Sequence, residues 1–139
     1  MPNLTIFDLD NTLLSGDSDR AWGQYIVEKK IVSDEFLLES ENFYNSYYDG
    51  SLDIHSFLDF CLKPLMENEW SDLIELRKGF IENKIKPMIL NKAVEAVELS
   101  KSKGPVVIAT ATNSFVTRPI ADLFGIKDLI ATEFIVRDN

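Results

Sequence analysis

The sequence predicts an α/β protein built on a parallel sheet, and three short apolar runs carry that prediction. They are residues 4–9, 105–110 and 128–132, each rich in side chains that suit buried strands and each ended by polar residues. The segment 114–124 between the second and third runs has the length of a helix and apolar side chains that could face a sheet. Together they form a β-α-β unit, whose crossover should be right-handed.

Apolar side chains recur at helical spacing through the long middle of the chain. This pattern predicts roughly four short helices and a fifth that leads into the second strand. The stretches are residues 22–26, 36–47, 54–65, 73–81 and 89–97. Ser33 is a cap candidate, a helix is expected to follow Ser71, and Gly104 stands where a C-terminal cap is expected. The third helix should stop near Pro64, and Pro119 should lie in the first turn of its helix.

A strand, a long helical excursion and a return to α/β alternation indicate two domains. We expect a core made of residues 1–15 and 88–139, with residues 16–87 inserted into it as a helical lid. The lid would be joined to the core by polar or proline-bearing hinges.

Composition narrows the class of protein. The chain has 139 residues, 45% of them hydrophobic, which is enough for the core of one ordinary domain. Its net charge of -9 argues against a nucleic-acid backbone or an anionic membrane as the main partner. One cysteine, Cys61, excludes an internal disulfide, and no apolar segment reads as a signal peptide or membrane span. We therefore expect a soluble cytoplasmic protein.

Two carboxylates, Asp8 and Asp10, end the first apolar run. In an open parallel sheet, ligands bind beyond the carboxyl ends of the strands. Two anions this close repel each other unless a cation or a hydrogen-bond donor compensates, and Mg²⁺ is the simplest such cation. A carboxylate beside Mg²⁺ can attack phosphorus, and the second can move protons. The alternative is two solvated turn residues or a helix cap.

Residues 4–14, LTIFDLDNTLL, resemble motif I (D-x-D-x-T) of the haloacid dehalogenase superfamily. Residues 106–113, VVIATATN, resemble motif II, an apolar strand that ends in Ser or Thr. The segments 115–126 and 131–133 are similar to the phosphoserine-phosphatase-like branch. The resemblance covers nearly the whole chain. It implies a three-layer, Rossmann-like parallel sheet with a helical cap inserted between the two motifs, and Mg²⁺-dependent phosphatase activity through an aspartyl-phosphate.

The resemblance also implies roles for the two aspartates. Asp8 would be the nucleophile and, through its other oxygen, a metal ligand. Asp10 would be the general acid and base, and its backbone carbonyl would be a second metal ligand.

Further roles follow for residues around them. Thr12 would support the loop by hydrogen bonds, and the Thr110 hydroxyl would hold a phosphate oxygen. Backbone N–H groups of Leu9, Asp10 and Ala111 would donate to the phosphate. Arg20 would either pair with an anionic part of the leaving group or form a surface ion pair.

The family also uses a lysine and a late acidic motif, both beyond the strand that contains Ile130. Neither occurs before Asn139. We therefore expect a core that is incomplete at its C-terminus and a first strand with an unpaired apolar edge, open to self-association. The 139-residue chain should then be a weakly active or inactive fragment of a phosphatase that acts on a small phosphorylated metabolite. The alternatives are a non-catalytic binding or regulatory module and a phosphoryl-transferring mutase.

Overall fold

A computed structural model describes residues 3–135 and divides the chain into two units, Met1–Asp19 with Ile81–Asn139 and Arg20–Phe80. The first is the α/β unit and the second is the helical unit. The strands are β1 (Thr5–Phe7), β2 (Val106–Asn113) and β3 (Asp128–Thr132). The α-helices are α1 (Ser18–Glu28), α2 (Glu35–Asp49), α3 (Ile54–Met66), α4 (Trp70–Phe80), α5 (Asn91–Lys103) and α6 (Ser114–Leu123). A π-helical turn, Ile81–Ile85, and a 3-10 turn, Lys86–Met88, join α4 to α5. None of the helices between residues 3 and 135 combines the length and apolarity that a bilayer span requires.

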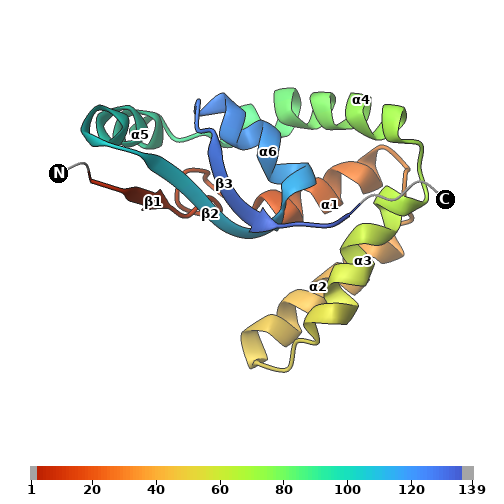
Figure 1. The fold of residues 1–139 in the computed structure, drawn as a ribbon. Coiled ribbons are helices and arrows are strands. Elements are labelled where there is room, and N and C mark those ends of the chain that lie inside the picture. The colour runs from red at the N-terminus through yellow and green to blue at the C-terminus, as the bar shows by residue number, and fades with distance from the viewer. Residues whose placement is uncertain (1–2, 136–139) are drawn as a thin grey trace. The chain divides into compact units, whose positions relative to one another are not determined.

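The sheet is parallel in the order β1-β2-β3, which confirms the α/β prediction. Phe7, Ile108 and Leu129 lie in register across it. In Figure 1, α5 and α6 lie on the same side of the strands, as right-handed crossovers require. Ile108 and Val106 are buried on that side, so the core of the α/β unit lies between the sheet and these two helices.

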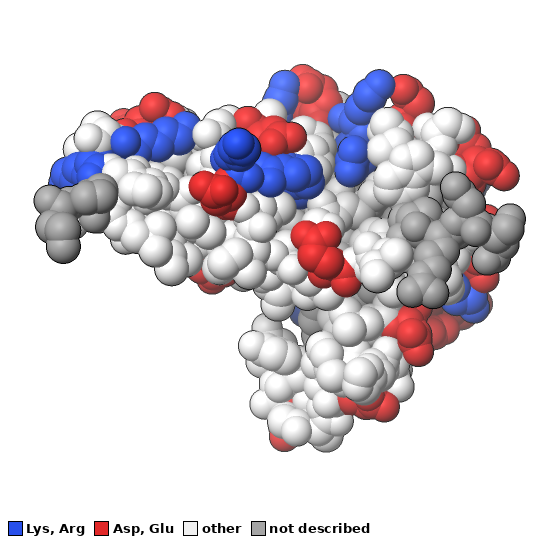
Figure 2. Space-filling model, viewed as in Figure 1, with Lys and Arg blue, Asp and Glu red and all other residues white. Residues whose placement is uncertain are grey.

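The opposite face of the sheet is apolar and exposed. Ile6 and Ile130, which share this face with Val107 and Ala109, are 59% and 64% exposed. Figure 2 shows few charged side chains over β1 and β2. Within the described sheet β1 pairs with β2 alone, so its other edge is open there. Self-association through this edge stays a prediction.

β2 is longer than the sequence indicated, because it continues past Thr110 to Asn113. Its pairing with β3 is irregular at this point. Ala109 pairs with Ile130, but the next pair is Asn113 with Thr132, so β2 carries extra residues between the two pairs. A bulge of this kind redirects side chains at the end of a strand.

Two prolines lie inside helices where the sequence predicted a boundary. Pro119 lies within α6, which begins at Ser114, so its expected place in the first turn was wrong. Pro64 lies inside α3, which continues to Met66. Leu65 and Ile120, which follow these prolines, are buried, and such packing offsets the missing backbone hydrogen bond.

The expected helix starts in the helical unit are also shifted. Asp34, not Ser33, precedes α2, and the Ser33 hydroxyl donates to the Glu35 carboxylate, which lowers the pKa of that group. Ser71 lies inside α4, which already begins at Trp70. Several short polar side chains near these boundaries made more than one helix start plausible from the sequence.

Gly104 does follow the last residue of α5, as predicted. A β-carbon there would lie 2.1 Å from the backbone oxygen of Asn3. The close approach of the two backbones therefore excludes a side chain at this position.

Aromatic rings organise the helical unit. Trp22 and Tyr25 of α1 pack on Phe80, with ring centroids 5.2 and 5.5 Å from it. Phe36 of α2 stacks on Phe60 of α3 with centroids 4.4 Å apart. Most of these predicted apolar positions are therefore used in packing.

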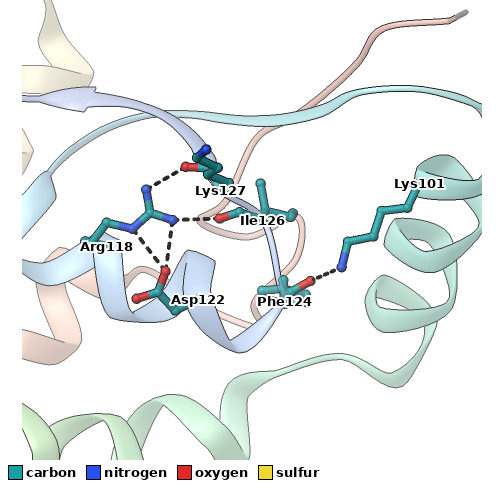
Figure 3. A network of polar contacts seen from close by, with 6 residues as sticks. All are labelled: Lys101, Arg118, Asp122, Phe124, Ile126 and Lys127. Carbon is teal, nitrogen blue, oxygen red and sulfur yellow. Dashed lines mark hydrogen bonds and ion pairs between the residues drawn. The ribbon is translucent and has the colours of Figure 1, made fainter.

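The turn between α6 and β3 is fastened by cationic side chains (Figure 3). Arg118 donates to the backbone oxygens of Ile126 and Lys127, at 2.6 and 2.9 Å, and pairs with Asp122 at 3.0 Å. One guanidinium thus satisfies two carbonyls of the turn that follows α6.

Gly125 in this turn provides a test of the network. Its φ is +65°, and a β-carbon would lie 2.7 Å from the Nζ of Lys101, which donates to the Phe124 oxygen at 2.6 Å. We expect Gly125→Ala to lower the free energy of unfolding by about 1 kcal/mol from backbone strain and further by displacing Lys101. Chemical denaturation measures both effects.

Gly50→Ala is the matched control, because Gly50 has φ +81° and nothing within 4 Å of the added carbon. It should show the strain cost alone. Equal losses for the two variants would mean that the Lys101 contact contributes nothing.

Candidate functional site

The chain turns sharply after β1 around one backbone oxygen. The carbonyl of Leu9 accepts from the N–H groups of Thr12, Leu13 and Leu14, at 3.2, 2.9 and 3.2 Å. The side chains of Leu9, Leu13 and Leu14 are buried, which anchors both ends of the turn in the core. Asn11 takes φ +58°, a conformation that asparagine tolerates better than most residues. Asp8 and Asp10 are therefore held on a well-defined loop.

A second segment fastens this loop from the side. Leu14 and Ile89 form an antiparallel bridge, and the Ser15 N–H donates to the Met88 oxygen at 2.8 Å. The segment that leaves the α/β unit and the segment that returns to it thus lie side by side. The aspartate loop gains support from both.

Asp8 is exposed at the end of β1. Its Oδ1 accepts from the Leu9 N–H at 2.9 Å, and the Thr12 hydroxyl lies 3.4 Å from Oδ2. Thr12 thus contacts the loop as expected, through its backbone and through this long hydrogen bond. The Leu9 N–H, predicted as a donor to phosphate, donates here to Asp8.

Asp10 is half-buried, and each of its carboxylate oxygens accepts a hydrogen bond. Oδ1 accepts from the Ser18 N–H at the start of α1 at 2.7 Å. Oδ2 accepts from the Thr112 hydroxyl at 2.8 Å, across 102 positions of sequence. Two hydrogen-bond donors thus stabilise the charge of the second of the two neighbouring carboxylates.

The end of β2 supplies the facing side of the site. The hydroxyl oxygen of Thr110 accepts from the Thr112 N–H at 3.1 Å, and the Thr132 hydroxyl donates to the backbone oxygen of Ala111 at 2.7 Å. Thr110 and Thr112 are half-buried and Ala111 is exposed. β1 and β2 are parallel neighbours, so these residues and the aspartates share one edge of the sheet.

Arg20 belongs to the helical unit. It forms an ion pair with Glu41 at 3.1 Å, and its guanidinium lies 4.3 Å from the ring centroid of Tyr44. Of the two roles expected for Arg20, the structure therefore shows the ion pair.

The sequence did not predict the two contacts to Asp10, from Thr112 and from the backbone N–H of Ser18. Thr112 stands two positions after Thr110 in the motif II segment, and only the bulge in β2 turns its hydroxyl to Asp10. Ser18 contributes a backbone N–H, and a pattern of side chains cannot predict such a contact. The only feature of the sequence that pointed to Thr112 was that it follows Thr110 by two positions.

The donor set at the end of β1 suits Mg²⁺. Carboxylate and carbonyl oxygens are the hard ligands that this ion prefers, and it commonly takes only one or two carboxylates with several waters. Across residues 3–135 there is no group of three or more His, Cys, Asp or Glu side chains that could hold a metal ion. At the end of β1 the chain offers two carboxylates, those of Asp8 and Asp10, so a Mg²⁺ ion there would take its remaining donors from water and ligand oxygens.

Ser18 allows a test of which of its groups supports Asp10. Its hydroxyl is fully buried and makes no hydrogen bond, whereas its N–H contacts the carboxylate. We expect Ser18→Ala to leave the free energy of unfolding unchanged or raise it by about 1 kcal/mol, because an unsatisfied buried group is removed. Thermal and urea unfolding give the answer. A loss of more than about 1 kcal/mol would show that the hydroxyl has a partner that stabilises it.

Comparison with known proteins identifies the family of this chain. Residues 5–139 match the haloacid dehalogenase-like hydrolase family. A histidinol-phosphatase of Neisseria meningitidis serogroup C (strain 8013) is 39% identical over 135 residues, which cover 96% of this chain and 61% of the relative. The chain thus spans about three fifths of that relative's length.

Solved structures agree. A Bordetella pertussis Tohama I protein of unknown function has a TM-score of 0.88 at 31% identity, over 99% of this chain and 64% of that one. A phosphoserine phosphohydrolase-like protein from Francisella tularensis subsp. tularensis SCHU S4 has a TM-score of 0.70 at 26% identity, over 99% and 61%. The chain therefore belongs to the haloacid dehalogenase-like hydrolases, in their phosphoserine-phosphatase-like branch.

Proposed function

We propose that the protein is a phosphomonoester hydrolase that works through an aspartyl-phosphate on Asp8. The observation that carries this proposal is the contrast between the two carboxylates. Asp8 is exposed at the end of the strand, while both oxygens of Asp10 accept hydrogen bonds from fixed donors. An accessible carboxylate suits nucleophilic attack, and an oriented one suits proton transfer. The histidinol-phosphatase relative supports the same reaction class.

The reaction has two steps. A carboxylate oxygen of Asp8 attacks phosphorus and forms an O–P bond, while the ester P–O bond breaks and the leaving oxygen takes a proton from Asp10. Water then attacks the phosphorus of the aspartyl-phosphate, its proton passes to Asp10, and the Asp8 O–P bond breaks. Inorganic phosphate leaves, and Asp8 is again a carboxylate and Asp10 again the carboxylic acid with which the cycle begins.

The end of β2 is the proposed binding site of the phosphoryl group. We assign the Thr110 hydroxyl and the backbone N–H of Ala111 as donors to phosphate oxygens, with the N–H groups of Leu9 and Asp10 on the opposite side. The Leu9 N–H would exchange its contact with Asp8 for one with phosphate. These donors lie at the edge where parallel strands end, which favours an anion there.

Mg²⁺ is the proposed cofactor, held by the Asp8 carboxylate and the Asp10 backbone carbonyl. When bound, it would screen the repulsion between the attacking carboxylate and the phosphate. Thr12 supports this loop through its contacts with Leu9 and Asp8.

The proposed substrate is a small phosphorylated molecule. Histidinol phosphate and phosphoserine are the first esters to test, because relatives of this chain are described by those activities. Arg20 would contribute to an anionic leaving group only by giving up its ion pair with Glu41. The chain spans about three fifths of the curated relative, so the activity is proposed for the protein as a whole.

Asp8→Asn tests the proposed function. The amide is a poor nucleophile, so we expect hydrolysis of p-nitrophenyl phosphate to fall by a factor of about 10³ or more. Phosphate release is measured with Mg²⁺ and again with excess EDTA, which should abolish the parental rate. The assay uses the protein at its natural length.

Asp128→Asn is the matched control, since it removes one exposed carboxylate at the start of β3. It should keep the parental rate. Parental activity in Asp8→Asn, or activity that survives EDTA, would refute the assigned roles.

A further inference from the structure

We propose that Thr112 is a positioning residue that orients the Asp10 carboxylate for proton transfer, an inference that rests on the proposed function. The contact behind it joins two distant parts of the chain. The Thr112 hydroxyl donates to Asp10 Oδ2 at 2.8 Å, and the two residues are 102 positions apart. Both are half-buried, so water competes less with this hydrogen bond than at the surface.

A second donor makes the orientation unique. The Ser18 N–H donates to the other oxygen, Oδ1, at 2.7 Å. One donor on a carboxylate leaves it free to turn about that contact, whereas donors on separate oxygens define the plane of the group. Charge-assisted hydrogen bonds of this length are the stronger kind. The lone pairs that face the substrate are therefore held in one direction.

The bulge at the end of β2 fixes Thr112 in turn. Its N–H donates to the Thr110 hydroxyl oxygen at 3.1 Å. The neighbouring Ala111 oxygen accepts from the Thr132 hydroxyl at 2.7 Å, which ties the bulge to β3. The two extra residues between the Ala109 and Asn113 pairings bring the Thr112 hydroxyl to the β1 loop. The bulge therefore has a structural role at the site, because it brings the Thr112 hydroxyl to Asp10.

Orientation matters most when the leaving group needs a proton. A general acid contributes typically 10²–10⁴-fold, roughly, and its effect depends on correct geometry. Phenyl phosphate and p-nitrophenyl phosphate have leaving groups of similar size, but phenoxide is much the stronger base. Loss of orientation should therefore slow phenyl phosphate more than p-nitrophenyl phosphate.

Thr112→Val and Thr112→Ser form the test pair, because valine removes the hydroxyl at similar volume and serine retains it. We expect kcat for phenyl phosphate to fall about tenfold in Thr112→Val, against about twofold for p-nitrophenyl phosphate, with KM little changed. Thr112→Ser should restore most of the loss. Thr117→Val is the control, since it removes a buried hydroxyl that donates to the backbone oxygen of Asn113 at 2.9 Å, and it should not alter the ratio of the two rates.

A second measurement does not depend on turnover. Amide hydrogen exchange at Ser18 reports the contact with Asp10 Oδ1. It should become faster in Thr112→Val, because the carboxylate can turn, and stay parental in Thr112→Ser and Thr117→Val. The inference is overturned if exchange at Ser18 is unchanged in Thr112→Val, or if both esters slow by the same factor. A parent that hydrolyses neither ester refutes the proposed function instead, and Ser18 exchange then decides the role of Thr112.

Discussion

The hydrogen bonds to Asp10 are the constraint on which the site depends. One carboxylate joins the loop after β1, the first turn of α1 and the bulged end of β2. Two of these segments have anchors of their own: the loop has buried leucines around the Leu9 carbonyl, and the bulge has its hydrogen bond to Thr132. Because these contacts already order the loop and the bulge, holding Asp10 between its donors requires little further ordering of the chain. A catalytic group held in this way is preorganised before any ligand arrives.

Two carboxylates placed two residues apart repel each other, and in this structure they differ in how many hydrogen bonds they accept. Asp10 takes donors on both oxygens, while Asp8 stays exposed, with the adjacent Leu9 N–H and a long contact to Thr12. The same pair of residues can therefore perform different chemistry, because environment rather than residue type separates their roles. An incoming phosphate or cation would meet Asp8 first. This asymmetry is the physical basis for assigning attack to Asp8 and proton transfer to Asp10.

Much of this could be predicted from the sequence, and the failures share a cause. Apolar runs located the three strands of the described sheet, because strands of a parallel sheet often read as continuous apolar runs, and the β-α-β pattern indicated that the strands are parallel. The aspartate loop was recognisable from Asp8 and Asp10 themselves. The extension of β2, the bulge and the role of Thr112 were missed, because they depend on pairing with β3 and on contact with a loop 102 positions away. Pro119 was misplaced for a similar reason, since tertiary packing outweighed its local preference.

The central claim is that Asp8, and not Asp10, carries the phosphoryl group. The most direct measurement is acid quenching during turnover of p-nitrophenyl phosphate with Mg²⁺, followed by peptide mass mapping of the protein. We expect one phosphoryl group in the peptide that contains residues 4–14, located on Asp8 by fragmentation and absent from Asp8→Asn. A phosphoryl group on Asp10, or turnover with no acyl-phosphate at either residue, would contradict it.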